Sequence, residues 1–219
     1  VFQQIKVYYS RKQFKKAKGT EIGENILLDL FSKNGFTIIS PEQLTLDEQI
    51  AVVRNTKLLC GIIGTLGHNM LFAKPERHMI LVNKTHNINV AQMDINKMKN
   101  LDMTYIDSYL AEFPSLIGNG PFLITYSEKL NQYVERHNWK KPAEDVIRET
   151  VLKRNLQEYE EMYRSRNLKN LRLVYEKNPD RFDYFAPDHL LELEMRFYHL
   201  EHPATMREKI FYQYNRVKR

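Results

Sequence analysis

The residues best suited to binding a ligand lie in a glycine-rich turn that follows an apolar run. Five of them stand close together directly after residues 58–63: Gly64, Thr65, Gly67, His68 and Asn69. Glycine lets a backbone approach a phosphate closely. A helix that begins at such a turn offers free N–H groups and the positive end of its dipole to an anion. The spacing therefore predicts an anion-binding turn, although a plain strand-to-helix connection would use the same residue types.

A second candidate group ends the first apolar run, residues 5–9. Ser10 and Arg11 follow it directly, and an arginine at the end of a strand can fork onto a phosphate. Arg11 also begins a basic cluster that continues through Lys18, and a solvated loop would explain that cluster equally well. Glu24, at the start of a predicted helix, can either accept hydrogen bonds from sugar hydroxyls or stabilise the helix dipole.

The sequence lacks the motifs that are typical of several other activities. No lysine stands at P-loop spacing, and the dinucleotide pattern G-x-G-x-x-G and the nucleophile pattern G-x-S-x-G are absent. His68, His78 and His86 are spread over different predicted elements, without acidic or cysteine partners at ligand spacing. The sequence therefore predicts neither a metal site nor a cofactor.

The elements that must position these residues alternate between strands and helices. The central apolar runs are hydrophobic on both faces, as in parallel sheets that are covered by helices on both sides. This pattern predicts an α/β, Rossmann-like parallel sheet, with the ligand outside the carboxyl ends of its strands. We expect strands at 5–9, 36–39, 58–63, 78–82 and 103–106 and helices at 21–34, 46–55 and 90–99, the last with Met93 and Met98 facing inward.

The pattern changes near residue 140. A long, charged helix is predicted over 143–166, with an apolar stripe that includes Leu152 and Tyr159, and further helices are predicted over 188–199 and 205–217. We therefore expect a Rossmann-like domain over residues 1–140 and a helical appendage over 141–219. The appendage is compatible with packing on the sheet domain and with a homo-oligomer contact, and the sequence does not decide between them.

The amino-acid composition limits the binding partners and the cellular location that can be expected. The 219 residues hold 33 Lys+Arg against 27 Asp+Glu, a net charge of +6 that is spread over both parts of the chain, so a nucleic-acid-binding domain is not expected. No run approaches the ~20 apolar residues of a membrane-spanning helix. The single cysteine, Cys60, lies in an apolar run and is predicted to be buried, which fits a reducing, cytoplasmic location.

Taken in order, the motifs resemble the family 61 glycosyltransferases over about residues 4–82. Leu66-Gly67 stands where many members have His-Gly, and Gly23 stands where they have asparagine, changes that resemble a bacterial branch associated with capsule or surface-polysaccharide synthesis. The pieces that carry the resemblance are Ser10-Arg11, Gly23-Glu24, Gly35-Phe36, Pro41-Glu42-Gln43-Leu44-Thr45-Leu46-Asp47-Glu48-Gln49 and Gly64-Thr65-Leu66-Gly67 with Phe72.

The resemblance implies the C-terminal, donor-binding half of a GT-B fold and inverting transfer from a nucleotide-sugar donor without an essential metal. In that setting Arg11 and the backbone of residues 64–69 would stabilise the leaving diphosphate, and Glu24 would bind donor hydroxyls. A glycan or lipid-linked glycan would be the acceptor, at the inner face of a membrane, and the catalytic base would lie in the other half. A chain of 219 residues is too short for both halves and the helical tail, so such an enzyme would need further sequence.

Two other functions remain open on the sequence. The same fold without an acceptor half would serve as a non-catalytic nucleotide-sugar-binding or scaffold module. The basic segments 11–18 and 216–219 would suit a binder of anionic polymers or membrane surfaces.

Overall fold

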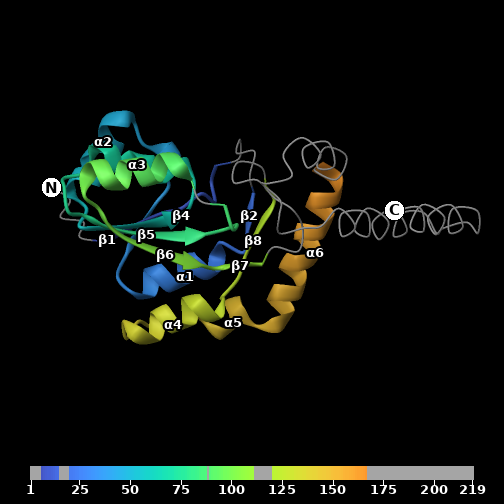
Figure 1. Ribbon diagram of the computed structural model, residues 1–219. Coiled ribbons are helices and arrows are strands. Elements are labelled where there is room, and N and C mark those ends of the chain that lie inside the picture. Colours follow the sequence, from blue (N-terminus) through green and yellow to red (C-terminus); the bar gives the residue numbers. More distant parts are fainter. Residues whose placement is uncertain (1–5, 15–19, 88, 111–119, 167–219) are drawn as a thin grey trace, which may run out of the picture. The chain divides into compact units, whose positions relative to one another are not determined.

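The computed structural model describes residues 6–14, 20–87, 89–110 and 120–166. A parallel five-stranded sheet is its central element (Figure 1). Its strand order is β3-β1-β4-β5-β6, and every neighbouring pair is parallel. The predicted α/β, Rossmann-like class is thereby confirmed. The strands are β1 (Lys6–Tyr9), β3 (Thr37–Ile39), β4 (Leu58–Ile62), β5 (His78–Asn83) and β6 (Asp102–Asp107).

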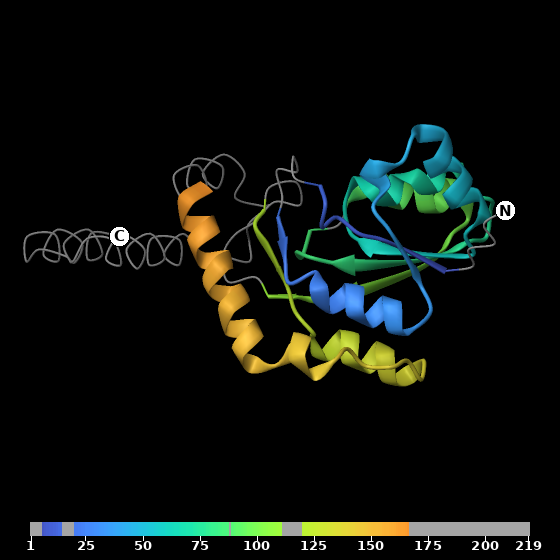
Figure 2. The same cartoon turned by 180° about the vertical axis from the view of Figure 1, so that it is seen from behind.

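Helices cover both faces of this sheet (Figures 1 and 2). One face carries α1 (Asn25–Lys33) and α4 (Glu128–Arg136), and the other carries α2 (Leu46–Asn55), the 3₁₀ helix η2 (Thr65–Phe72) and α3 (Val90–Lys99). The bounds of α2 and α3 are those that the sequence predicts. A short 3₁₀ helix, η1 (Pro41–Gln43), precedes α2.

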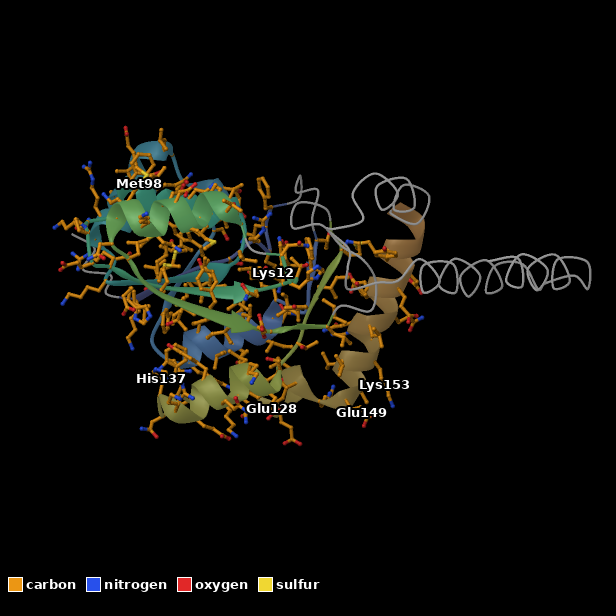
Figure 3. All side chains as sticks on the ribbon, in the orientation of Figure 1. Lys12, Met98, Glu128, His137, Glu149 and Lys153 are labelled. Atoms are coloured by element: carbon orange, nitrogen blue, oxygen red, sulfur yellow. The ribbon has the colours of Figure 1, made fainter. Side chains whose placement is uncertain are left out.

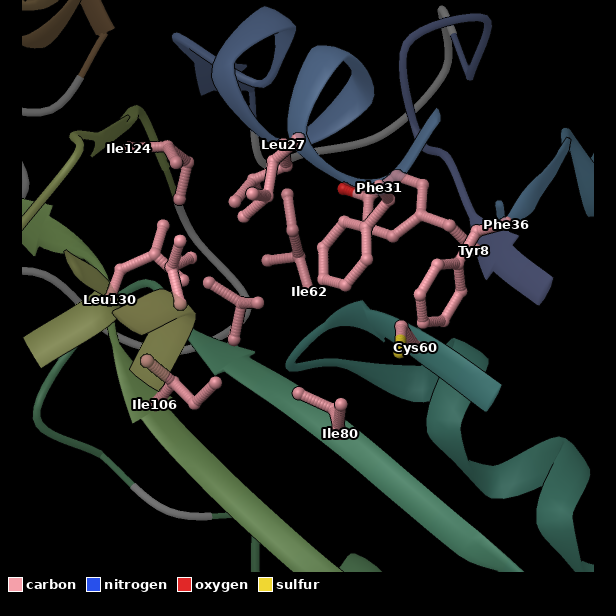
Figure 4. Close-up of a cluster of buried hydrophobic side chains, with 13 residues drawn as sticks. Tyr8, Leu27, Phe31, Phe36, Cys60, Ile62, Ile80, Ile106, Ile124 and Leu130 are labelled. Carbon is pink, nitrogen blue, oxygen red and sulfur yellow. The ribbon is translucent and has the colours of Figure 1, made fainter. Parts of the chain in front are cut away.

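Two hydrophobic clusters lie on the two faces. Under α1 and α4, the Tyr8 ring stacks on Phe31 at 4.7 Å between centroids, beside the side chains of Cys60, Ile62 and Ile80 (Figure 4). The opposite cluster joins alternate residues of the same strands to α2, η2 and α3. Cys60 is fully buried, as predicted, and its burial raises the pKa of the thiol well above the ordinary value, so it acts as a core side chain.

A second, three-stranded sheet in the order β2-β8-β7 was not predicted. β2 (Glu21–Ile22) runs parallel to β8 (Phe122–Ile124), and β7 (Tyr109–Leu110) runs antiparallel to it. The helix predicted from residue 21 therefore begins only at Asn25, because Glu21 and Ile22 pair as a strand.

The inward face of α3 also differs from the prediction. Met93 is 52% exposed and Met98 is 74% exposed on the outer side of the helix, whereas Gln92 and Ile95 are buried (Figure 3). Gln92 occupies an inward position because its carboxamide packs against Gly67 and donates a hydrogen bond to Asn96 Oδ1 at 2.8 Å. A polar residue thus holds a place that the apolar pattern assigned to methionine.

The charged segment after residue 140 forms two helices, α5 (Glu144–Ile147) and α6 (Glu149–Arg166), which are separated by extended backbone at Arg148. The chain divides into two compact units, Val1–Met162 and Tyr163–Arg219, so residues 141–162 belong with the sheet. On α6, Tyr159 is buried and Leu152 is 38% exposed. The helices predicted over 188–199 and 205–217 lie outside the described residues. Among the described helices, none has the length and apolar content to cross a bilayer.

Candidate functional site

The topology places two candidate segments side by side at one edge of the sheet. β1 and β4 are neighbours in the sheet, and the chain continues from β1 to β3 on one side and from β4 to β5 on the other, so the connections after these two strands leave in opposite directions. Such a switch point opens a crevice outside the carboxyl ends of the two central strands. Ser10 and Arg11 follow β1 at this edge, and Gly64 follows β4.

The Arg11 side chain rests against the glycine turn. A Cβ placed on Gly64 would lie 3.5 Å from Arg11 Nη1, so the guanidinium faces the turn across the space that a single Cβ would fill. The side chain is only 10% exposed, and its guanidinium carbon lies 5.7 Å from the centre of the Phe14 ring. The structure therefore places Arg11 beside Gly64.

A buried acid binds Arg11 and a second cation. Glu21 Oε1 accepts a hydrogen bond from Lys84 Nζ at 2.6 Å and lies 3.0 Å from Arg11 Nε. The Nε–H of Arg11 does not point at this oxygen, so that contact is an ion pair without a hydrogen bond. Lys84 also lies over the Phe122 ring, 4.2 Å from its centre, in a cation–π contact. One carboxylate thus faces two cationic side chains.

The ionisation of Lys84 responds to this burial. Desolvation lowers the pKa of Lys84 below its ordinary value, and the Arg11 charge lowers it further, while the Glu21 carboxylate opposes both effects. Glu21 and Lys84 are 4% and 3% exposed, respectively. A cation this deep is stable only with a charge partner, and Glu21 is that partner.

Glu24 lies under the end of β1. Its Oε1 accepts hydrogen bonds from the backbone N–H of Arg11 at 2.9 Å and from the Tyr8 hydroxyl at 3.1 Å. Burial raises the pKa of Glu24, although these bonds and one from the Ser10 hydroxyl favour its charged form. Glu24 therefore fixes the backbone from which the Arg11 side chain extends.

The glycine turn divides into an open beginning and a packed end. Thr65 is exposed, whereas Gly67 is buried against Gln92 and its N–H donates to the Gly64 carbonyl at 3.3 Å. The side chains of the two remaining predicted residues bind neighbouring helices. Asn89 Nδ2 donates to His68 Nε2 at 3.0 Å, beside the start of α3, and Asn69 Nδ2 donates to Gln49 Oε1 on α2 at 3.0 Å.

Sequence reasoning did not assign Lys84 or Glu21 to the site. The sequence did contain a signal for Lys84, because this lysine directly follows β5. Arg11 similarly stands just after β1, with Ser10 between them. Glu21 stands at the start of a predicted helix, where the sequence allowed either a dipole role or a hydrogen bond to a ribose or sugar hydroxyl, and nothing indicated that it pairs with cations.

The chemistry of this site suits an anion. Two cationic groups and the start of η2 converge at one strand edge. The N–H groups of Thr65 and Leu66 precede the first N–H with a partner inside this helix, which is that of Gly67. Among the residues that the structure describes, no cluster of three or more His, Cys, Asp or Glu side chains could hold a metal ion.

Comparison with known proteins gives one finding. The family model described as Glycosyltransferase 61 matches residues 2–80, which is less than half of the chain but includes Arg11, Glu21, Glu24 and the glycine turn. This match supports a glycosyltransferase of family 61 for that part of the chain. No curated protein and no solved structure matches.

Proposed function

We propose that the described unit binds the diphosphate of a nucleotide sugar at the switch point between β1 and β4. The observation that carries this proposal is the position of the Arg11 guanidinium, which rests against the Gly64 turn beside the carboxyl ends of both strands. The family match over the same residues supports a sugar donor as the source of the diphosphate.

In this proposal the chain is the donor-binding half of a GT-B glycosyltransferase that inverts the sugar carbon without a metal ion. The acceptor hydroxyl attacks the anomeric carbon and gives its proton to a general base in the other half of the enzyme, while the bond to the diphosphate oxygen breaks and the negative charge stays on the leaving diphosphate. Arg11 and the first-turn N–H groups of η2 would stabilise that charge in place of a cation. Glu24 supports the site by holding the Arg11 backbone N–H. We assign no catalytic base within this chain.

The proposed setting follows the resemblance. A glycan or lipid-linked glycan would accept the sugar in the synthesis of a surface polysaccharide, in the cytoplasm at the inner face of a membrane. The helical tail would serve packing or self-association.

Calorimetric titration with UDP-, GDP- and CMP-sugars tests donor binding. We expect one nucleotide class to bind, and we expect Arg11→Gln to weaken it about tenfold to a hundredfold, because a hydrogen bond to a charged group contributes about 1.5–3 kcal/mol. Lys12→Gln is the matched control, since Lys12 is the neighbouring, exposed cation and its Nζ donates to Asn25 Oδ1.

Equal effects of the two substitutions would contradict the role of Arg11. Failure of every nucleotide sugar to bind at millimolar concentration would contradict the proposed function. A non-catalytic nucleotide-sugar-binding module would bind the donor equally well, so transfer of the sugar to an acceptor by a longer chain that includes the acceptor-binding half distinguishes the two functions.

A further inference from the structure

We propose that Lys84 is a positioning residue that acts through Glu21 and keeps Arg11 available for an anion. This inference rests on the proposed function, because the anion would be the diphosphate of the donor. Lys84 itself lies too deep to serve as an open contact, with 3% of its side chain exposed. Its influence on the ligand would pass through the carboxylate that it shares with Arg11.

The contacts of Glu21 Oε1 show which cation the carboxylate serves. Lys84 Nζ makes the hydrogen bond at 2.6 Å, whereas Arg11 Nε lies 3.0 Å away with its N–H turned from the oxygen. The short, charge-assisted bond is the stronger of the two. Glu21 is therefore occupied mainly by Lys84, and the buried Nε–H of Arg11 has no aligned acceptor among the described residues.

The charged groups around Arg11 are unevenly paired. Arg11 and Lys84 both face the single carboxylate of Glu21. Glu24 is the next acid, and its charge also acts on Lys84, but its Oε1 is engaged by the Arg11 backbone N–H and the Tyr8 hydroxyl, and it has no hydrogen bond to either cationic side chain. Among the described residues the Arg11 guanidinium therefore has an ion pair but no hydrogen-bonded carboxylate, and an anion would supply that bond.

Without Lys84, the carboxylate would turn to Arg11. Glu21 and Arg11 would then form a neutral, hydrogen-bonded pair, and a diphosphate would have to displace Glu21 before it could bind the guanidinium. Arg11 is thus available to an anion because Lys84 holds the Glu21 carboxylate, which would otherwise compete with that anion for the guanidinium.

Titration with inorganic pyrophosphate tests this arrangement in the full chain. We expect Lys84→Met to weaken pyrophosphate binding about tenfold or more and Lys84→Arg to retain most of the affinity. Lys12→Met removes the same charge from an exposed neighbour that does not contact Glu21, and we expect a change of less than about twofold. Equal losses in Lys84→Met and Lys12→Met would overturn the proposal, since the loss would then reflect net charge alone.

A double-mutant cycle with Glu21→Gln provides a test that does not depend on one variant's stability. Glu21→Gln should bind pyrophosphate at least as tightly as the parent chain, because it removes the competitor of the ligand. Adding this substitution to Lys84→Met removes the carboxylate that would pair with Arg11 and should recover affinity relative to Lys84→Met alone. Weaker binding by Glu21→Gln, or no recovery in the double variant, would contradict the inference.

A measurement without ligand separates this inference from the proposed function. In ¹⁵N-labelled protein, we expect the Arg11 Nε–H resonance to move downfield and to exchange more slowly with water in Lys84→Met, as Glu21 forms a hydrogen bond to it. An unchanged resonance would overturn the coupling between Lys84 and Arg11. If the resonance changes but pyrophosphate and nucleotide sugars do not bind, the coupling holds and the proposed function fails.

Discussion

Burial of the Glu24 carboxyl group raises its pKa above the ordinary value of 4.5. The folded chain therefore holds a proton on Glu24 in a range just above pH 4.5 where the unfolded chain has lost it. Stability contributed by such a group is fully present below the unfolded pKa and is lost as the pH rises through the folded pKa. The hydrogen bonds from Arg11 N and the Tyr8 hydroxyl limit this effect but do not reverse it.

Glu24→Gln should remove this pH dependence, because an amide does not titrate. The free energy of unfolding of the parent chain, minus that of the variant, is expected to decrease as the pH rises from 4.5 toward 7, and urea denaturation at several pH values measures it. Glu42→Gln, which removes a carboxylate from an exposed position, is the control substitution. A difference that grows with pH would mean that hydrogen bonds to the carboxylate outweigh its burial.

Among the elements, the junction of β2 and α1 depends on Gly23. This residue has a φ of +87°, and a Cβ placed on it would lie 2.3 Å from the Ile124 carbonyl oxygen on β8. Gly23→Ala must therefore push the second sheet apart in addition to straining the backbone. Gly35 is a matched control, with a φ of +79° and no atom within 4 Å of its added Cβ.

We expect Gly35→Ala to lower the free energy of unfolding by about 1 kcal/mol and Gly23→Ala to lower it by about 3 kcal/mol or more. Because Glu24, which holds the Arg11 backbone N–H, directly follows Gly23, Gly23→Ala should also weaken pyrophosphate binding, whereas Gly35→Ala should not. Denaturant titration and calorimetry measure the two effects. Equal destabilisation by both substitutions would show that the approach of Gly23 to β8 does not constrain the fold.

The same elements show what the sequence can and cannot predict. The start of α2 is predictable because its signal is local: Thr45 Oγ1 accepts from Glu48 N, and Glu48 Oε2 accepts from Thr45 N at 2.8 Å. β2 has two residues and pairs with β8, about a hundred positions later, so no local pattern marks it. A sequence pattern therefore assigns the residues of such a short strand to the helix that follows it.

The candidate site divides in the same way. Arg11 and Gly64 are predictable because each follows an apolar strand and the carboxyl ends of parallel strands meet at one edge. Glu21 is not, since its role arises only when the second sheet brings it to Lys84. The ligand-facing residues of this fold thus have local signals, whereas the residues that set their charge depend on tertiary pairing.

At the scale of the whole molecule, the segment after α4 completes the first unit. The Trp139 ring packs edge-on against Phe36 at 5.4 Å and Phe31 at 5.9 Å between centroids. Asn34 exchanges two hydrogen bonds with the Lys140 backbone, at 2.8 and 2.9 Å. These contacts join residues about one hundred positions apart, so the core under α1 needs the chain beyond α4.

Truncation at two points tests this dependence. A fragment of residues 1–166 contains the whole first unit, both hydrophobic clusters and the candidate site, and we expect it to unfold cooperatively and to bind pyrophosphate like the full chain. A fragment of residues 1–138 loses Trp139 and the Lys140 contacts, and we expect it to lose about 3–5 kcal/mol or more of stability, the cost of deleting a large core aromatic. Circular dichroism melts and calorimetry compare the two fragments. Loss of cooperative unfolding in the longer fragment would show that the first unit requires residues beyond 166. Equal stability of the two fragments would show that the core does not need Trp139.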